Sequence, residues 1–133
     1  MSEAQRNMMR THGTLVGRTL IGLLFLVSGG GMLLGGAEGV AGMIASKGLP
    51  LASLIAWVVI LTKVLGGAAL ILGYRVGCAA AALFIFTALT IVLFHNAFID
   101  PTQQTAALKN LSIMGGLLYV MAYGAGEGWR ISR

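Results

Sequence analysis

The chain alternates between long apolar segments and short polar segments. The apolar segments cover about residues 15–36, 51–73, 76–95 and 106–124. Each is about 18 residues or longer and carries few charges, which at about 1.5 Å of helical rise per residue suffices to cross a hydrocarbon core about 30 Å thick. The pattern therefore predicts an all-α fold, a four-transmembrane-helix bundle that forms a single domain over residues 1–133.

The polar segments predict how the spans are connected. Residues 1–14 are polar and basic, and we expect a short arm followed by an uncleaved first span, because no small-residue cleavage site follows that span. Val40, Met43 and Ile44 fall at helical spacing, which predicts a short interfacial helix between the first two spans. Asp100 before Pro101 is typical of an N-cap followed by the first helical residue, so the fourth helix should begin outside the hydrocarbon.

Composition supports a bilayer as the surrounding solvent. The chain is 57% hydrophobic and 10% charged, whereas soluble domains carry about 25% charged residues. The formal charge of +5 does not indicate nucleic acid as a partner, because the basic residues stand singly at the ends of apolar runs and form no basic stripe. Six arginines fall on one side of the predicted membrane and two lysines on the other: Arg6, Arg10, Arg18, Arg75, Arg130 and Arg133 against Lys47 and Lys109. Because basic residues concentrate on the cytoplasmic side, this asymmetry predicts that both termini lie in the cytoplasm.

Glycine is frequent within the spans, and the chain contains 20 glycines in total. Small residues allow helix backbones to approach closely in lipid, where no hydrophobic effect drives helices together. We expect most of these glycines to serve packing within the bundle. Gly31 and Gly35 form one G-x-x-x-G, which leaves open a homo-oligomer through a glycine-rich helix face.

The reactive residues exclude several function classes. Cys78 is the only cysteine, so the chain lacks the cysteine pairs of quinone-linked disulfide oxidases. The two histidines, His12 and His95, are expected on opposite faces of the membrane, which argues against a bis-histidine haem site. No flavin, nucleotide or metal-ligand pattern is present. A proton-coupled transporter of the small multidrug type needs an intramembrane carboxylate, but all acidic residues lie outside the predicted spans: Glu3, Glu38, Asp100 and Glu127.

Lys63 is the most informative residue within a span. It lies about 18 Å along the second helix by the helical rise, where a lysine costs about 2.5–3.5 kcal/mol on insertion scales. The ammonium could snorkel to the interface, lose its proton, pair with an acidic residue of another subunit, or bind an anionic head group. The cost predicts that Lys63 faces the bundle interior or a subunit contact.

A second candidate site lies where the third and fourth helices meet the outer interface. His95, Asn96, Lys109 and Asn110 gather there together with Asp100. His95 could contact a quinone carbonyl, ligate a metal or anchor at the lipid head groups. We expect His95 to lie within side-chain reach of Lys109 or Asn110, so that these residues form a ligand- or partner-binding pocket.

Four motifs, in this order, resemble the DoxX family of small four-helix membrane proteins, and the resemblance covers nearly the whole chain. They are Arg18-x-x-x-Gly22-x-x-Phe25-x-x-Ser28-Gly29; Gly66-Gly67-x-x-Leu70-x-Leu72-Gly73 with Arg75; Phe94-His95-Asn96 with Ala107-Leu108-Lys109-Asn110-Leu111; and Gly126-x-Gly128-Trp129-x-Ile131-Ser132. The sequence departs from the family pattern at Met32 and Lys63, where the family usually has a lysine and a glutamate.

The resemblance implies a multi-pass protein of the bacterial inner (plasma) membrane. Named family members are linked to membrane oxidoreductases, so it also implies an accessory or quinone-proximal subunit of a membrane redox system. The cofactor stays open, with quinone as the candidate small-molecule ligand, and the lipid bilayer and other subunits of a redox complex are the candidate partners. Because the sequence contains no redox centre, the alternative is a non-catalytic membrane scaffold or a small-molecule permeation protein.

The predicted topology can be tested with reporter fusions at residue 133 and in the 96–104 loop. We expect cytoplasmic reporter activity from the first fusion and periplasmic activity from the second, because basic residues concentrate on the side of both termini. Strong periplasmic activity from the C-terminal fusion would contradict this orientation.

Overall fold

The computed structural model describes residues 1–94 and 99–131, and every regular element within these ranges is helical. Four of the helices are long and apolar enough to cross a membrane. These helices are α2 (Thr14–Gly35), α4 (Ala52–Leu72), α5 (Val76–Leu93) and α6 (Gln104–Tyr123). Each begins and ends within two residues of a predicted apolar segment, so the prediction of an all-α, four-span fold is confirmed.

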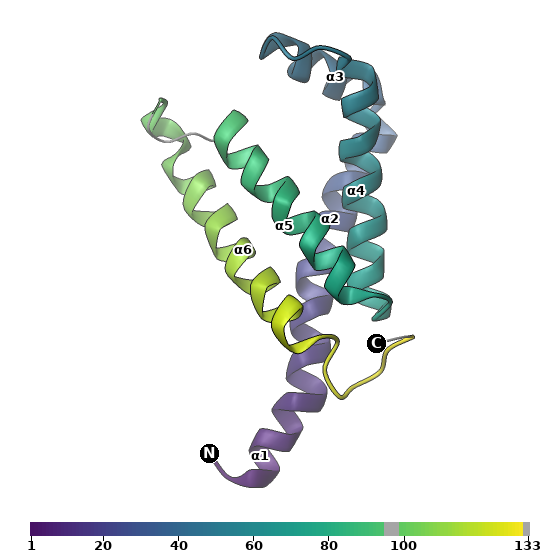
Figure 1. Ribbon diagram of the computed structural model, residues 1–133, viewed down its shortest axis with the longest axis vertical. Helices are drawn as coiled ribbons and strands as arrows, with labels where there is room; N and C mark the ends of the chain where they lie inside the picture. Colours follow the sequence, from purple (N-terminus) through teal and green to yellow (C-terminus); the bar gives the residue numbers. More distant parts are fainter. Residues whose placement is uncertain (95–98, 132–133) are drawn as a thin grey trace.

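The first span is the end of a longer helix. α1 (Glu3–Met8) begins at a capping box made by Ser2 and Gln5, passes through the π-helical turn η1 (Met9–Gly13) and continues directly into α2. The whole helix has 33 residues, which corresponds to about 50 Å at the helical rise. The segment expected as a short polar arm is therefore helical, and α1 extends beyond the rest of the bundle (Figure 1).

The four spans form two pairs. α2 packs along α4 and α5 packs along α6, whereas α2 and α6 have few contacts. Figure 1 shows the two pairs close together at the end that bears the α4–α5 turn and farther apart at the end that bears α3 (Ala37–Ser46). We call these the narrow end and the wide end.

Glycines set the close contact between α2 and α4. A Cβ atom on Gly22 would lie 2.6 Å from the carbonyl oxygen of Gly67, and a Cβ atom on Gly67 would lie 2.6 Å from that of Gly22. A Cβ atom on Gly29 would lie 2.7 Å from the Cβ of Lys63. The predicted packing role of glycine therefore holds at these positions. Gly31 and Gly35 would meet no atom within 4 Å, so the G-x-x-x-G faces outward from the chain.

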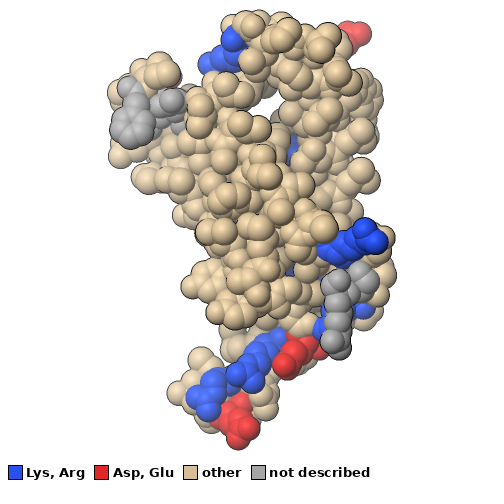
Figure 2. Space-filling view, in the orientation of Figure 1, with Lys and Arg blue, Asp and Glu red and all other residues tan. Residues whose placement is uncertain are grey.

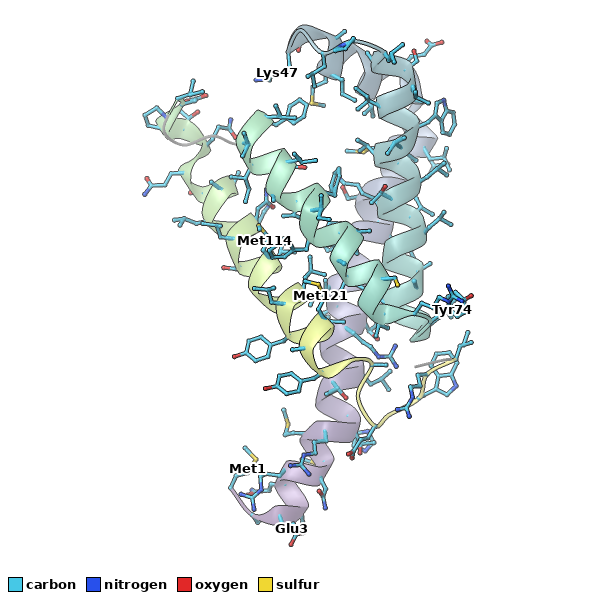
Figure 3. All side chains as sticks on the ribbon, viewed as in Figure 1. Met1, Glu3, Lys47, Tyr74, Met114 and Met121 are labelled. Carbon is cyan, nitrogen blue, oxygen red and sulfur yellow. The ribbon has the colours of Figure 1, made fainter. Side chains whose placement is uncertain are left out.

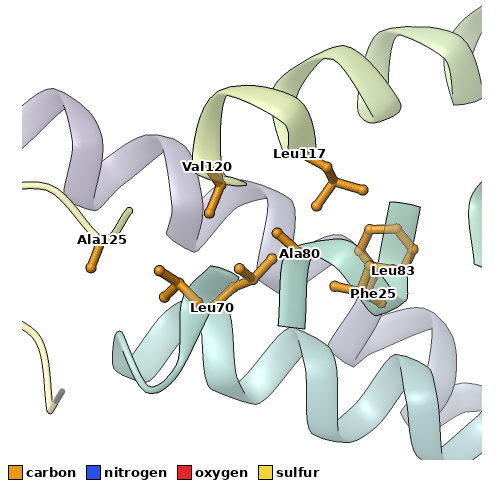
Figure 4. Close-up of a cluster of buried hydrophobic side chains, with 8 residues drawn as sticks. Phe25, Leu70, Ala80, Leu83, Leu117, Val120 and Ala125 are labelled. Atoms are coloured by element: carbon orange, nitrogen blue, oxygen red, sulfur yellow. The ribbon is translucent and has the colours of Figure 1, made fainter. Parts of the chain in front are cut away.

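The main core lies nearer the narrow end and draws side chains from all four spans. Figure 4 shows Phe25, Leu70, Leu83 and Leu117 converging there, together with Ala125 of the C-terminal tail. A second cluster joins α3 to α4, where Val40 and Ile44 pack on Ala56 and Ile60. The predicted interfacial helix between the first two spans is thus present as α3.

Large apolar side chains also cover the outside of the spans. Leu20, Leu34 and Leu65 are 62%, 92% and 64% exposed, a surface that suits lipid and not water. In Figure 2 most charged atoms lie at the wide end and in the lower part of the molecule, and the broad band between them is largely uncharged apart from blue atoms visible between the helix pairs. Figure 3 places Lys47 and Tyr74 at opposite ends of this band.

The contact between Gly22 and Gly67 can be tested by substitution. Gly67→Leu should separate α2 from α4 and cost about 1–3 kcal/mol of stability, the usual range for overpacking a close contact. Thermal unfolding in mild detergent measures the effect, and Gly31→Leu is the matched control because its Cβ meets no neighbour. Equal unfolding midpoints for the two variants would show that the close contact is not required.

Candidate functional site

A buried arginine joins three parts of the chain at the narrow end. Arg18 is only 2% exposed. Its guanidinium donates to the carbonyl oxygens of Leu70 at 2.7 Å, Ile71 at 2.8 Å and Ala125 at 3.1 Å, and also to that of Trp129. α2, the last turn of α4 and the C-terminal tail (residues 124–131) are therefore held by one side chain.

Backbone carbonyls replace a carboxylate as the partners of Arg18. The last carbonyls of a helix have no intrahelical donor and carry the negative end of the helix dipole, so the C-terminal turn of α4 attracts a cation. Five N–H groups in a planar fork allow an arginine to serve several carbonyls at once. The sequence interpretation of Arg18 as a charge that sets topology was incomplete, since this residue is buried and structural. Its position inside an apolar run, not before it, was the available signal.

The C-terminal tail lies against both first and second spans. The Glu127 N–H donates to the Arg10 carbonyl at 3.1 Å, and the Ile131 N–H donates to the Leu72 carbonyl at 3.0 Å. Gly126 contacts the side chain of Thr14 so closely that no Cβ would fit, and its φ of +85° also favours glycine. The G-x-G-W pattern of the tail thus serves close packing against the first helix.

A cavity of about 190 Å³ lies among the four spans, and we call it the lysine cavity. Its lining combines polar and apolar side chains from every span: Leu24, Phe25 and Ser28 of α2, Lys63 of α4, Phe86, Thr87 and Thr90 of α5, and Lys109, Asn110 and Ile113 of α6. Leu24 and Lys109 are exposed, so the cavity reaches the surface of the molecule.

Lys63 points into the lysine cavity and makes two contacts there. Its Nζ donates to Ser28 Oγ at 2.7 Å and lies 5.5 Å from the centre of the Phe86 ring. A cation over a ring face within about 6 Å gains electrostatic attraction from the ring quadrupole. The hydroxyls of Thr87 and Thr90 donate to carbonyls of their own helix, so these two hydroxyls do not donate a hydrogen bond into the cavity. The structure therefore places Lys63 in the bundle interior, as its depth in the sequence suggested.

The structure brings together residues that the sequence assigned to two different sites. Lys63, from the middle of a span, lines the same cavity as Lys109 and Asn110, which the sequence placed in the outer polar cluster. His95 and Asn96 lie outside the described residues, so their place in this cluster stays a prediction. Sequence reasoning missed Ser28 and Phe86, because a serine and a phenylalanine inside apolar runs carry no signal of a site.

The remaining polar residue of that cluster has a local structural role. Asp100 precedes the short turn η2 (Pro101–Gln103) and accepts hydrogen bonds from the Thr102 N–H at 3.0 Å and the Thr102 hydroxyl at 2.6 Å. These bonds favour the carboxylate and hold the pKa of Asp100 below its usual value. The predicted N-cap is confirmed, with the difference that a 3₁₀ turn precedes α6.

Contacts at the wide end connect α3 to the end of α5. Phe94 packs against the cluster formed by α3 and α4, and Lys47 Nζ lies 5.7 Å from the centre of the Phe94 ring. Lys47 does not line the lysine cavity. No group of three or more potential metal ligands occurs among residues 1–94 and 99–131.

Comparison with known sequences agrees with the fold and the motifs. The sequence model of the DoxX family matches residues 13–96, which include Arg18 and Lys63. The chain belongs to the DoxX family. This match covers the first three spans, whereas the resemblance noted from the motifs extends to the fourth helix and the tail; Lys109 and Asn110 lie beyond the matched residues.

This DoxX chain is also similar to the inner membrane protein YqjF of Escherichia coli (strain K12). The two are 34% identical over 114 residues, which cover 86% of this chain and 85% of YqjF. No solved structure matches the chain.

The two departures from the DoxX pattern have different surroundings. Met32 packs against the apolar cluster that joins α3 to α4. Lys63 instead faces the lysine cavity and Ser28. In this DoxX protein, position 32 therefore contributes apolar packing, and position 63 contributes a positive charge to the cavity.

The role of Arg18 can be tested with Arg18→Met, which keeps much of the side-chain length and removes every donor. Loss of these charge-assisted hydrogen bonds should lower stability by roughly 3 kcal/mol and release the C-terminal tail. Thermal unfolding and the rate of tryptic cleavage at Arg130 measure the two effects. Arg6→Met is the matched control, because Arg6 is exposed and its guanidinium donates to the carbonyl of Met1 at the start of the same helix. Indistinguishable behaviour of the two variants would argue against a structural role for Arg18.

Proposed function

We propose that this protein is an accessory subunit of a redox system in the bacterial inner membrane, and that the lysine cavity holds the head group of a quinone. The observation that carries the proposal is the convergence of Lys63, Lys109 and Asn110 on one cavity within the membrane-spanning bundle. The location follows the four spans and the similarity to an inner membrane protein.

The chemistry of the lining suits a quinone head group. A quinone ring is apolar and carries two carbonyl oxygens, which accept hydrogen bonds. Both lysines and the Asn110 amide are donors, and Phe25, Phe86 and Ile113 supply apolar surface around them.

The size of the lysine cavity also favours a head group over a whole ligand. Its volume of about 190 Å³ is below the range of about 300–1,000 Å³ that is typical of sites for complete small molecules. The cavity reaches the surface beside Leu24, within the span α2. A polyprenyl tail would therefore remain in the bilayer while the ring enters the bundle.

In this role the chain binds the quinone, and partner subunits carry out electron transfer. The chain has one cysteine, Cys78, and the sequence contains no flavin or nucleotide fingerprint. A partner carrying a flavin, haem or metal centre would exchange electrons with a quinone that this subunit holds near it.

Quinone content of the purified protein tests the proposal. The tagged protein is purified in gentle detergent from bacterial membranes, and co-purifying quinones and proteins are quantified by mass spectrometry. We expect wild-type protein to retain quinone. Lys63→Met and Asn110→Leu should each reduce the quinone content by about tenfold, because a quinone carbonyl that loses its hydrogen-bond donor costs about 1–3 kcal/mol of binding free energy. Lys47→Met is the matched control and should retain wild-type content, because Lys47 does not line the cavity.

Two results would contradict the proposal. Quinone content that is equal in wild-type protein, Lys63→Met and the control would place any quinone elsewhere, as ordinary solubilised lipid. Wild-type protein that retains partner proteins but no quinone would favour the alternative of a non-catalytic scaffold.

A further inference from the structure

The lysine cavity carries positive charge that the chain does not balance. Lys63 and Lys109 both line it, and none of the lining residues is acidic. The sequence has only four acidic residues, and all lie outside the spans: Glu3, Glu38, Asp100 and Glu127. No carboxylate of this chain therefore stands within a span to pair with either lysine.

The contacts of Lys63 leave most of its ammonium unsatisfied. An ammonium has three N–H donors, and among residues 1–94 and 99–131 those of Lys63 are directed to one hydroxyl, Ser28 Oγ, and to the face of the Phe86 ring. A neutral acceptor supplies a hydrogen bond but leaves the charge of a buried cation uncompensated. An anionic oxygen supplies a charge-assisted bond, which is roughly twice as strong as a neutral one.

We infer that the lysine cavity selects a ligand with an anionic oxygen on an apolar tail. The chemistry is that of a long-chain carboxylate or of the ionised hydroxyl of a quinone-type ring. This inference rests on the proposed function for the location of the binding site and adds selectivity for charge.

The positions of the two lysines fit such an amphiphile. Lys63 lies inside the bundle against Ser28 and Phe86, whereas Lys109 is exposed at the surface end of the same cavity. Lys109 would attract the anion from the lipid interface, and Lys63 would hold the oxygen within the bundle. Asn110, next to Lys109 in the lining, can donate a further hydrogen bond.

The test compares pairs of ligands that share an apolar tail and differ in whether the head group is anionic, bound to the full-length protein in nanodiscs of neutral phosphatidylcholine. Isotope-labelled palmitate is paired with hexadecanol, and an alkyl 2-hydroxynaphthoquinone, which is ionised at neutral pH, is paired with its O-methyl ether. Empty nanodiscs correct for partition into lipid. We expect at least one anionic ligand to bind about tenfold more tightly than its neutral partner, which corresponds to one charge-assisted contact.

Variants assign this preference to the lysine cavity. Lys63→Gln should abolish the preference while retaining a donor for Ser28, and Lys63→Arg should preserve it because the cation is kept. Lys47→Met should bind as wild type does. Size-exclusion profiles confirm that each variant is folded, and Lys109→Met gives a second test of the cavity if Lys63→Gln does not fold.

The outcomes separate this inference from the proposed function. Preference for palmitate alone supports the inference and contradicts the quinone assignment, whereas preference for the ionised naphthoquinone supports both. Equal binding of each anionic ligand and its neutral partner, with neutral quinone still bound, overturns the inference and leaves the proposed function standing. A preference for charge that survives in Lys63→Gln and Lys109→Met would also overturn it, because the anion would then bind elsewhere.

Discussion

The architecture depends on how one arginine is satisfied inside an apolar bundle. Arg18 donates to two carbonyls at the end of α4 and to two in the C-terminal tail, so three segments that are far apart in the sequence are held together at the narrow end. One turn of helix beyond it, Gly22 meets Gly67 at backbone distance. Lipid supplies no hydrogen bonds to polar groups and no hydrophobic effect that drives helices together. The hydrogen bonds of Arg18 and the close backbone contact of Gly22 with Gly67 therefore hold this end of the bundle together.

Closure at the narrow end explains where the lysine cavity forms. Small residues and the main apolar core bring the four helices together near Arg18, and the two helix pairs diverge toward α3 (Figure 1). The lysine cavity lies between the diverging pairs, and its polar lining includes Lys63, Lys109 and Asn110. At the wide end, α3 and Phe94 pack together with α4, so apolar contacts also cover the region beyond the cavity. The candidate site thus adjoins the main core along the bundle axis, and Phe25 belongs to both.

The sequence predicted the elements well because physical constraints with a sequence signature determine them. Hydrocarbon thickness sets the length of each span, the 3.6-residue period revealed α3, and Asp100 before Pro101 marked the start of the fourth helical segment. The role of Arg18 had no such signature, since its partners are backbone carbonyls that any residue provides. Whether Lys63 and Lys109 line one cavity depends on how each helix is rotated and how far the pairs diverge, and residue spacing along one helix does not encode either quantity. The helical continuation of α2 through Met9–Gly13 into α1 was hidden by the polar composition of that segment.

The most direct test of a head-group site in the lysine cavity is to map where a bound quinone lies. A quinone with a photoreactive group on its ring is irradiated with the protein in native-like membranes, and the labelled residues are identified by mass spectrometry. The account predicts labels on residues that line the cavity, in the segments of α4 around Lys63 and of α6 around Lys109, and their loss when unlabelled quinone competes. Labels confined to outward-facing positions such as Val58 and Leu65, or labels that persist under competition, would contradict it.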